Sequence, residues 1–324
     1  GGRFAQLPGN AKRLDRAQHN LKWCFPDWDD VRTRECAIEA YRHLFTLGIE
    51  VAACPRLIAA DGYASFVEIG DVRAGLRELL NDRPCILVTG HCGNWELLGA
   101  TMAVLGFPMH ALYRPMDIKP LDDWMLRTRS ARGMMLVDKF GAARVLPQLM
   151  QENKPVAFIA DQNAGDRGLF VPFFNRLASA YKTIGVMAMR YQAPIVCGTA
   201  RRLSGGLDAN HAATDAQRFR YHIEITDVIQ PEDWADQPDP LFYITARYRR
   251  AIEFMVRKAP EQYLWMHRYW KSRPRHERMG KPFPDRLREK IAALPWMSDE
   301  DVERLVDRSA VDAAMYAETG KPAR

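Results

Sequence analysis

Long apolar runs and paired cysteines are missing from this 324-residue sequence, and each absence excludes a class of protein. No apolar stretch reaches the ~20 residues that a helix needs to span a bilayer, so no transmembrane helix is expected. None of the six cysteines forms a C-x-x-C pair, which argues against a zinc site or a disulfide framework and favours a reducing, cytosolic compartment. No signal peptide is visible. Because the sequence begins Gly1-Gly2 rather than with Met, a preceding segment such as a membrane anchor remains open.

Glycine-rich nucleotide motifs are also missing. The sequence contains neither G-x-G-x-x-G nor a P-loop lysine, and it shows no metal-ligand spacing, so we predict no cofactor and no metal. A hydrophobic content of 47% fits a globular protein with a full core. The net charge of +6 indicates an acidic partner: a phosphorylated lipid, a membrane surface, an acidic protein or a nucleic acid.

Apolar runs and helical patterns alternate through the middle of the chain, which is typical of a mostly parallel sheet flanked by helices. Strands are predicted at 86–88, 110–113, 134–137, 156–160, 194–199 and 219–228. Helices are predicted at 94–105, 119–131, 142–153, 183–191 and 241–258. We divide the chain into a helical, basic N-terminal segment (1–60) that could rest on anionic lipid, an α/β domain (61–275) and a charged helical tail (276–324).

The stretch from Cys85 to Gly99 carries the most chemistry: C-I-L-V-T-G-H-C-G-N-W-E-L-L-G. It predicts a buried strand, a loop, and a helix for which Asn94 is a suitable N-cap. Glu96 would fall in the first helical turn, where the helix dipole keeps its carboxylate ionised, and His91 on the loop would lie within reach. A carboxylate that faces an imidazole fixes its tautomer and stabilises the imidazolium. His91 and Glu96 therefore predict a general-base dyad for a hydroxyl.

Other interpretations of the same loop stay open. G-H-C-G-N approaches the nucleophile elbow G-x-[SC]-x-G, with Cys92 as the nucleophile of a thiol hydrolase, but Asn94 stands where the last glycine belongs. The glycines could cradle a phosphate without the usual motif. His91 could also be an ordinary polar residue in a strand-to-helix turn.

Arginines follow the next predicted strand and helix. Arg114 should lie at the same sheet edge as His91, and Arg127, Arg129 and Arg132 fall around the end of the next helix. The planar guanidinium suits phosphate or carboxylate recognition, although charge pairing at a helix C-terminus would use the same residue type.

Asp161 and Gln162 end a further predicted strand. A carboxylate there could approach His91, position an acceptor, or cap the backbone amides of a turn.

Two aromatic segments allow several interpretations. F-V-P-F-F-N at 170–175 could be core, or the mobile wall of a groove for an acyl chain. L-W-M-H-R-Y-W-K-S-R-P at 264–274 could stack nucleobases, form a membrane-interface belt, or be a structural cation–π cluster.

Taken together, these motifs resemble the lysophospholipid acyltransferase superfamily, and more closely the bacterial lipid A late acyltransferases, the lauroyl/myristoyl transferases. H-C-G-N-W-E matches the family motif H-x-x-x-x-[DE]. N-L-x-x-C-F-P, Y-R-P, D-Q, F-V-P-F-F and W-x-H-R-x-x-K-x-R-P follow in the family's order, over about residues 20–274. Asn175 replaces a usual glycine, a mild change because Asn tolerates left-handed backbone. Tyr269 replaces a common arginine.

The resemblance implies a glycerol-3-phosphate acyltransferase-like fold and an enzyme of lipopolysaccharide biosynthesis. It would move a fatty acyl group from acyl-acyl carrier protein, or acyl-CoA, to a hydroxyl of a phosphorylated lipid A precursor. It implies His91 and Glu96 as catalytic residues, with Asn94, Arg114, Arg132, Asp161 and Gln162 binding substrate. The expected place is the cytoplasmic face of the bacterial inner membrane, either peripheral or through an anchor outside this chain.

Two alternatives accompany this interpretation. The acceptor could be another lipid or glycolipid. The chain could also be a non-enzymatic basic protein that binds lipid or RNA through residues 264–275, although nucleic acid is not the partner we predict.

Overall fold

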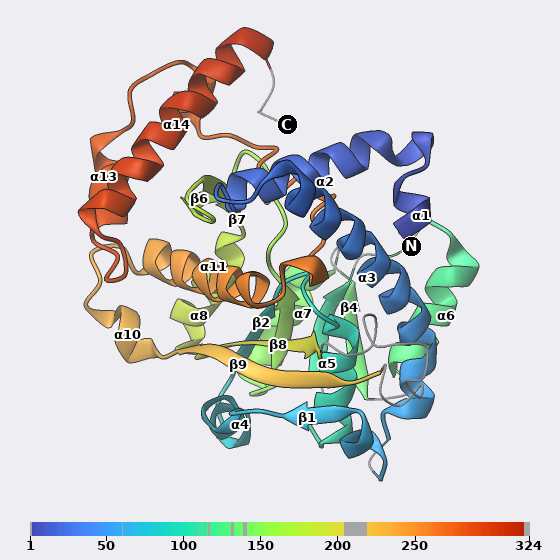
Figure 1. Cartoon of the computed structure of the whole chain (residues 1–324). Helices are drawn as coiled ribbons and strands as arrows, with labels where there is room; N and C mark the ends of the chain where they lie inside the picture. Colours follow the sequence, from blue (N-terminus) through green and yellow to red (C-terminus); the bar gives the residue numbers. More distant parts are fainter. Residues whose placement is uncertain are drawn as a thin grey trace.

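The computed structural model describes residues 2–59, 61–107, 109–113, 115, 117–130, 133–138, 141–203 and 219–320. A seven-stranded sheet lies at the centre, enclosed by helices, with α3 along the right of the view and α13 and α14 at the upper left (Figure 1). The chain begins with the helices α1 (Gly2–Ala5), α2 (Ala11–Cys24) and α3 (Asp30–Leu57). The predicted fold class, a mostly parallel sheet flanked by helices with a helical N-terminal segment, is confirmed.

The strands of the central sheet follow the order β1-β9-β8-β2-β5-β3-β4, in which only the pair β8–β9 is antiparallel among the described residues. They are β1 (Val67–Ile69), β2 (Ile86–Thr89), β3 (Met109–Tyr113), β4 (Met134–Asp138), β5 (Val156–Ile159), β8 (Ile195–Arg202) and β9 (Tyr221–Ile229). Because β2 and β5 are parallel neighbours, the residues that follow them meet at one edge of the sheet.

Helices cover both faces of the sheet. Five of them agree with the predicted helices within a few residues: α5 (Trp95–Val104), α6 (Lys119–Ser130), α7 (Ala142–Gln151), α8 (Lys182–Tyr191) and α11 (Pro240–Lys258). The short helices α4 (Arg73–Leu80) and α10 (Pro231–Ala235) were not predicted. Ile86 and Val88 of β2 join a buried cluster with α7, α8 and α11. On the opposite face, Leu97 of α5 packs in a second cluster. No helix in the described ranges is long and apolar enough to cross a bilayer.

A hairpin of β6 (Leu169–Pro172) and β7 (Leu177–Ala180) forms a separate two-stranded sheet that the sequence pattern did not predict. Its turn places Phe174 at φ 52° and Asn175 at φ 51°, the left-handed backbone that a type I′ turn needs at both central positions. Asparagine reaches this region more easily than other non-glycine residues, as expected for Asn175.

The two ends of the chain pack onto the α/β region. Asn20 of α2 donates to the carbonyl oxygens of Trp265, at 2.7 Å, and His267, at 3.1 Å. Leu21, near the N-terminus, and Leu305, near the C-terminus, belong to the same buried cluster as the centre of the sheet. The tail consists of α12 (Arg275–Arg278), α13 (Asp285–Ala292) and α14 (Asp299–Thr319).

Candidate active site

A histidine and an aspartate meet at the carboxyl edge of the sheet. His91, just after β2, places its ring Nδ1 2.7 Å from Oδ1 of Asp161, which follows β5. The backbone amide of His91 donates to Oδ2 of the same carboxylate at 3.0 Å. Asp161 is fully buried, whereas the His91 side chain keeps 18% of its surface exposed. The carboxylate therefore fixes the ring from the inside and leaves its other edge accessible.

Charges around His91 favour its protonated form. Burial alone lowers the pKa of His91, but attraction to Asp161, the hydrogen bond between them and the charge of Glu96 outweigh it, so the pKa is raised above 6.5. For Asp161, burial raises the pKa, but attraction and hydrogen bonds from His91 prevail and lower it to about 2. The pair is thus poised to hold one proton on the imidazole, as a base that has accepted a hydroxyl proton must do.

Glu96 was predicted to orient His91, and in the structure its carboxylate bonds instead to Arg129 of α6. The Arg129 Nε donates to Oε2 of Glu96 at 2.9 Å, and Nη2 donates to Oε1. Trp95 stands between the two in sequence, with its ring centroid 5.0 Å from that of His91. The five-residue spacing brings Glu96 near His91, but the first turn of α5 directs its carboxylate toward α6. Glu96 acts on His91 through its charge, which raises the pKa of the imidazole.

Asn94 begins α5, as predicted, by accepting a hydrogen bond from the Leu97 amide at 2.9 Å. Its side chain is fully buried, and its nitrogen donates to Glu50 of α3, at 3.2 Å, and to the Tyr221 hydroxyl, at 3.3 Å. Arg202 of β8 forms a buried ion pair with the same glutamate. These contacts join the start of α5 to α3 and β9, and the substrate binding predicted for Asn94 stays a prediction.

The loop between β2 and α5 needs glycine at Gly93. Its φ is +59°, and a Cβ there would lie 2.1 Å from the carbonyl oxygen of Ala200. The Gly93 carbonyl oxygen accepts a hydrogen bond from Nε2 of His43 at 2.9 Å, and the Gly93 amide donates to the Gln262 carbonyl at 3.0 Å. The helix α3, the strand β8 and the segment after α11 therefore all fix the backbone that carries His91.

Cys92 does not suit the role of a nucleophile. It is buried, its Sγ lies 3.9 Å from Sδ of Met255, and burial raises its pKa to about 12. A thiol that stays protonated at neutral pH and faces the core is inert. The structure thus argues against the thiol hydrolase.

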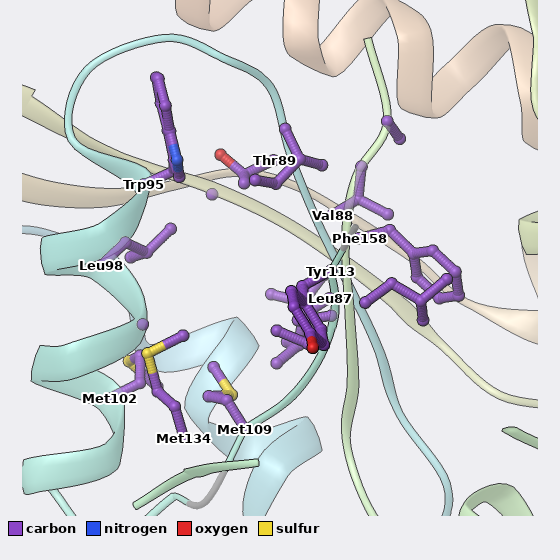
Figure 2. A pocket seen from close by; sticks show the side chains of 18 of the residues that line it. Leu87, Val88, Thr89, Trp95, Leu98, Met102, Met109, Tyr113, Met134 and Phe158 are labelled. Carbon is purple, nitrogen blue, oxygen red and sulfur yellow. The ribbon is translucent and has the colours of Figure 1, made fainter. Parts of the chain in front are cut away.

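A cavity of about 780 Å³ opens beside His91 and extends along α5. Trp95, Leu98 and Met102 line it from α5 at helical spacing (Figure 2). Met109 and Met134 close in on Met102 at the end away from Trp95 (Figure 2). Its other lining residues include the polar side chains of Thr89, Glu96, Asp122, Arg129 and Gln162. Of these, Glu96 acts on His91 by its charge and is bonded to Arg129, and most of the other lining residues are apolar.

The remaining predicted residues have different outcomes. Gln162 lines the cavity next to the histidine–aspartate pair. Arg114 and Arg132 lie outside the described residues, so their predicted phosphate contacts stay predictions.

Both aromatic segments are part of the core. Phe173 and Phe174 are buried and line no part of the cavity, so the segment 170–175 does not form its wall. Trp265, Tyr269 and Trp270 are at most 3% exposed, which leaves no ring free to stack a nucleobase or lie among lipid headgroups. Of the three interpretations of 264–274, the structural cluster is the one that fits.

Sequence reasoning missed the residues that support the loop from other elements. Arg129 was noted only as part of a cluster, and His43, Glu50 and Arg202 were not singled out. The sequence did contain one sign of this support. Glu50 is a charged residue within the mostly apolar run 47–54 of α3, and a carboxylate in such a run needs a buried partner.

His91 is oriented by a buried carboxylate and lines a mainly apolar cavity, an arrangement that suits acid–base chemistry beside an apolar ligand. Over residues 1–272 the chain matches the profile of the bacterial lipid A biosynthesis acyltransferases. It therefore belongs to this family and is an acyltransferase.

Similar proteins include the lipid A biosynthesis lauroyltransferase of Escherichia coli (27% identity over 274 residues, 81% of this chain and 80% of that protein). The lipid A biosynthesis palmitoleoyltransferase of the same organism is 26% identical over 274 residues, with the same coverage of both chains. A lipid A biosynthesis acyltransferase of Haemophilus influenzae is 22% identical over 79% of this chain and 74% of its own. Among solved structures, the 1-acyl-sn-glycerophosphate acyltransferase PlsC of Thermotoga maritima covers 80% of this chain and 93% of its own, with 15% identity and a TM-score of 0.33.

Proposed function

We propose that this acyltransferase moves a fatty acyl group from an acyl thioester, acyl-acyl carrier protein or acyl-CoA, to a hydroxyl of a phosphorylated lipid A precursor. One observation carries the proposal: the His91–Asp161 pair faces an apolar cavity large enough for an acyl chain. The family and the lipid A enzymes that the chain resembles give the acceptor class.

The reaction proceeds by general-base catalysis. The Nδ1–H of His91 donates to Asp161, so Nε2 carries the free electron pair and takes the proton of the acceptor hydroxyl. The hydroxyl oxygen attacks the thioester carbonyl carbon, and the tetrahedral intermediate expels the thiolate, which receives the proton from His91. The products are the new lipid ester and the free thiol of the carrier, and His91 is neutral again.

Glu96 stabilises the imidazolium by charge, and Arg129 holds Glu96 in place. This keeps His91 and Glu96 as catalytic residues and transfers the orienting role to Asp161. Arg114, Arg132 and Gln162 are proposed to bind the phosphorylated acceptor or the donor.

The pH dependence follows from the raised pKa of His91. The catalytic form is the neutral imidazole, so kcat/KM falls with decreasing pH through a pKa above 6.5. Asp161→Asn removes the main charge that raises this pKa, so the acid limb should move to lower pH while the plateau rate drops. The profile is measured from pH 5 to 9. An acid limb that stays in place would contradict the assigned partner.

The apolar cavity should bind the acyl chain and limit its length. Met102 lies seven residues beyond Trp95 on α5, about 10 Å along the helix axis from that residue, whose ring contacts His91. Met102→Trp should therefore lower kcat/KM for long acyl donors more than for short ones, by roughly fourfold per excluded CH₂ at ~0.8 kcal/mol each. Steady-state rates over a donor series measure this. Met279→Trp, at an exposed position, is the control, and an equal loss for all chain lengths in the Met102 variant would rule the cavity out.

We place the protein at the cytoplasmic face of the bacterial inner membrane. Support comes from exposed apolar side chains on α1 and α3: Phe4 and Ile49 are 44% and 73% exposed, and Phe4 packs against Phe45 with ring centroids 4.9 Å apart. Arg3 and Arg42 belong to the same two helices. Apolar and basic side chains side by side are typical of a surface that rests on anionic lipid.

A competition assay tests the proposed function. The chain receives acyl-acyl carrier protein or acyl-CoA as donor, and a tetra-acylated lipid A precursor together with a lysophospholipid as acceptors in detergent micelles. Mass spectrometry should find the new ester on the lipid A precursor. An ester on the lysophospholipid alone would assign a different acceptor.

A further inference from the structure

Arg249 of α11 is a fully buried cation that the mechanism above does not use. Its Nη1 donates to the carbonyl oxygen of Ala160 at 3.0 Å, and its Cζ lies 4.1 Å from the centroid of the Phe173 ring. Within the described part of the chain, no carboxylate lies within 4.0 Å of the guanidinium, and its Nε and Nη2 have no hydrogen-bond partner. A buried charge without an ion pair is costly, so its position calls for a reason.

Arg249 contacts the backbone next to the His91–Asp161 pair. The carbonyl that it binds belongs to Ala160, the residue directly before Asp161. The same helix, α11, also packs against Gly90, the residue directly before His91. A Cβ added at Gly90 would lie 2.7 Å from Cγ2 of Ile252 on α11 and 3.6 Å from Cβ of Asp161. The helix α11 therefore supports the backbone on both sides of the pair.

We propose that Arg249 is a positioning residue that acts through Asp161: its charge keeps the carboxylate ionised while His91 is neutral, and its hydrogen bond to Ala160 fixes the end of β5. The inference rests on the proposed general-base function. During one turnover His91 is first neutral and then positive. Asp161 is fully buried, so without another cation it would be an unpaired buried anion whenever His91 is neutral. Arg249 supplies that cation.

The electrostatics agree with this role. After burial, which raises the pKa of Asp161, and His91, which lowers it, Arg249 is a further group whose attraction lowers it. By Coulomb's law, the positive charge of Arg249 also opposes protonation of His91. The other titratable or charged groups whose charges act on this pair, or are acted on by it, come from several packed elements: Glu96 with its partner Arg129, Cys92, Tyr181, Tyr263, His267 and Tyr269.

The test separates the charge of Arg249 from its shape. Arg249→Met removes the charge and keeps an apolar stem on Phe173, so His91 should hold its proton more tightly. The acid limb of kcat/KM should move to higher pH by about one unit, and the rate at pH 6.5 should fall about tenfold, with KM little changed. Arg249→Lys keeps the charge and should bring the limb back toward its original place. Arg257→Met, on the same helix but paired with Glu253, should leave the limb unchanged.

A second readout does not depend on turnover. In protein labelled with ¹⁵N at the imidazole, NMR titration of His91 should give a higher pKa in Arg249→Met, or in Arg249→Gln if the methionine variant does not fold. If the wild type transfers no acyl group to any acceptor but His91 still titrates higher in the variant, the proposed function fails and the role of Arg249 stands. A uniform loss of rate at every pH, with an unmoved His91 titration, would reduce Arg249 to a packing role and overturn the inference.

Discussion

Asp312→Ala is expected to lower the free energy of unfolding by about 3–5 kcal/mol, because it leaves buried arginines without their counter-charge. The Asp312 carboxylate accepts hydrogen bonds from Arg176 at 2.7 and 3.0 Å, from Arg273 at 2.8 Å and from Arg308 at 3.0 Å. Arg176 and Arg273 are 4% and 1% exposed. In the variant Arg273 still pairs with the Glu277 carboxylate, so most of the lost stability comes from Arg176, which is left buried without a counter-charge.

Chemical denaturation followed by circular dichroism measures this change. Glu300→Ala, on the same helix and 78% exposed at its side chain, is the control and should stay within about 0.5 kcal/mol of the wild type. The family match ends at residue 272, so α14 brings this carboxylate from beyond the matched segment. Arg176 lies in the turn between β6 and β7, so its bonds to Asp312 join the hairpin to α14. An Asp312→Ala variant as stable as the control would mean that these bonds do not stabilise the hairpin.

His91→Ala is expected to lower the transfer rate by ~10²–10⁴-fold, the usual contribution of a general base. The residue is partly exposed, and its removal leaves the backbone bond from residue 91 to Asp161 available, so the fold should persist. Transfer is measured by ester formation, and folding by circular dichroism. His19→Ala, an exposed histidine on α2, is the matched control and should keep full activity. Turnover of His91→Ala within tenfold of the wild type would remove His91 from the mechanism.

The order of strands and helices could be predicted because each has its own period. The run Ile86–Thr89 and the helical pattern of α5 gave bounds that agree within a few residues. The strand β1 was missed because it has three residues, too few for a period to be visible. The hairpin β6–β7 was missed because Pro172 interrupts the apolar run 170–174, and in the structure this proline is the last residue of β6, where a two-stranded sheet tolerates it.

The site could be predicted only in part, because its contacts join distant parts of the chain. His91 and Glu96 share one loop, so sequence spacing favoured them as a pair. The carboxylate that actually holds His91 is 70 residues away, and it reaches the ring because β2 and β5 are adjacent in the sheet. Asp161 was a candidate for this place, but strand order is not written in local sequence. Arg249 left no local signal at all, since its role depends on where α11 packs.

Single-turnover transfer, quenched at intervals and analysed for both lipid ester and acylated protein, distinguishes direct attack on the thioester from transfer through an acylated protein. Wild-type protein is mixed with one equivalent of acyl donor in the presence of the lipid A precursor. Direct attack by a hydroxyl that His91 activates predicts that the ester appears in one phase while the protein keeps its unmodified mass. A protein-bound acyl group that forms before the ester, on Cys92 or any other residue, would exclude direct attack by the activated hydroxyl.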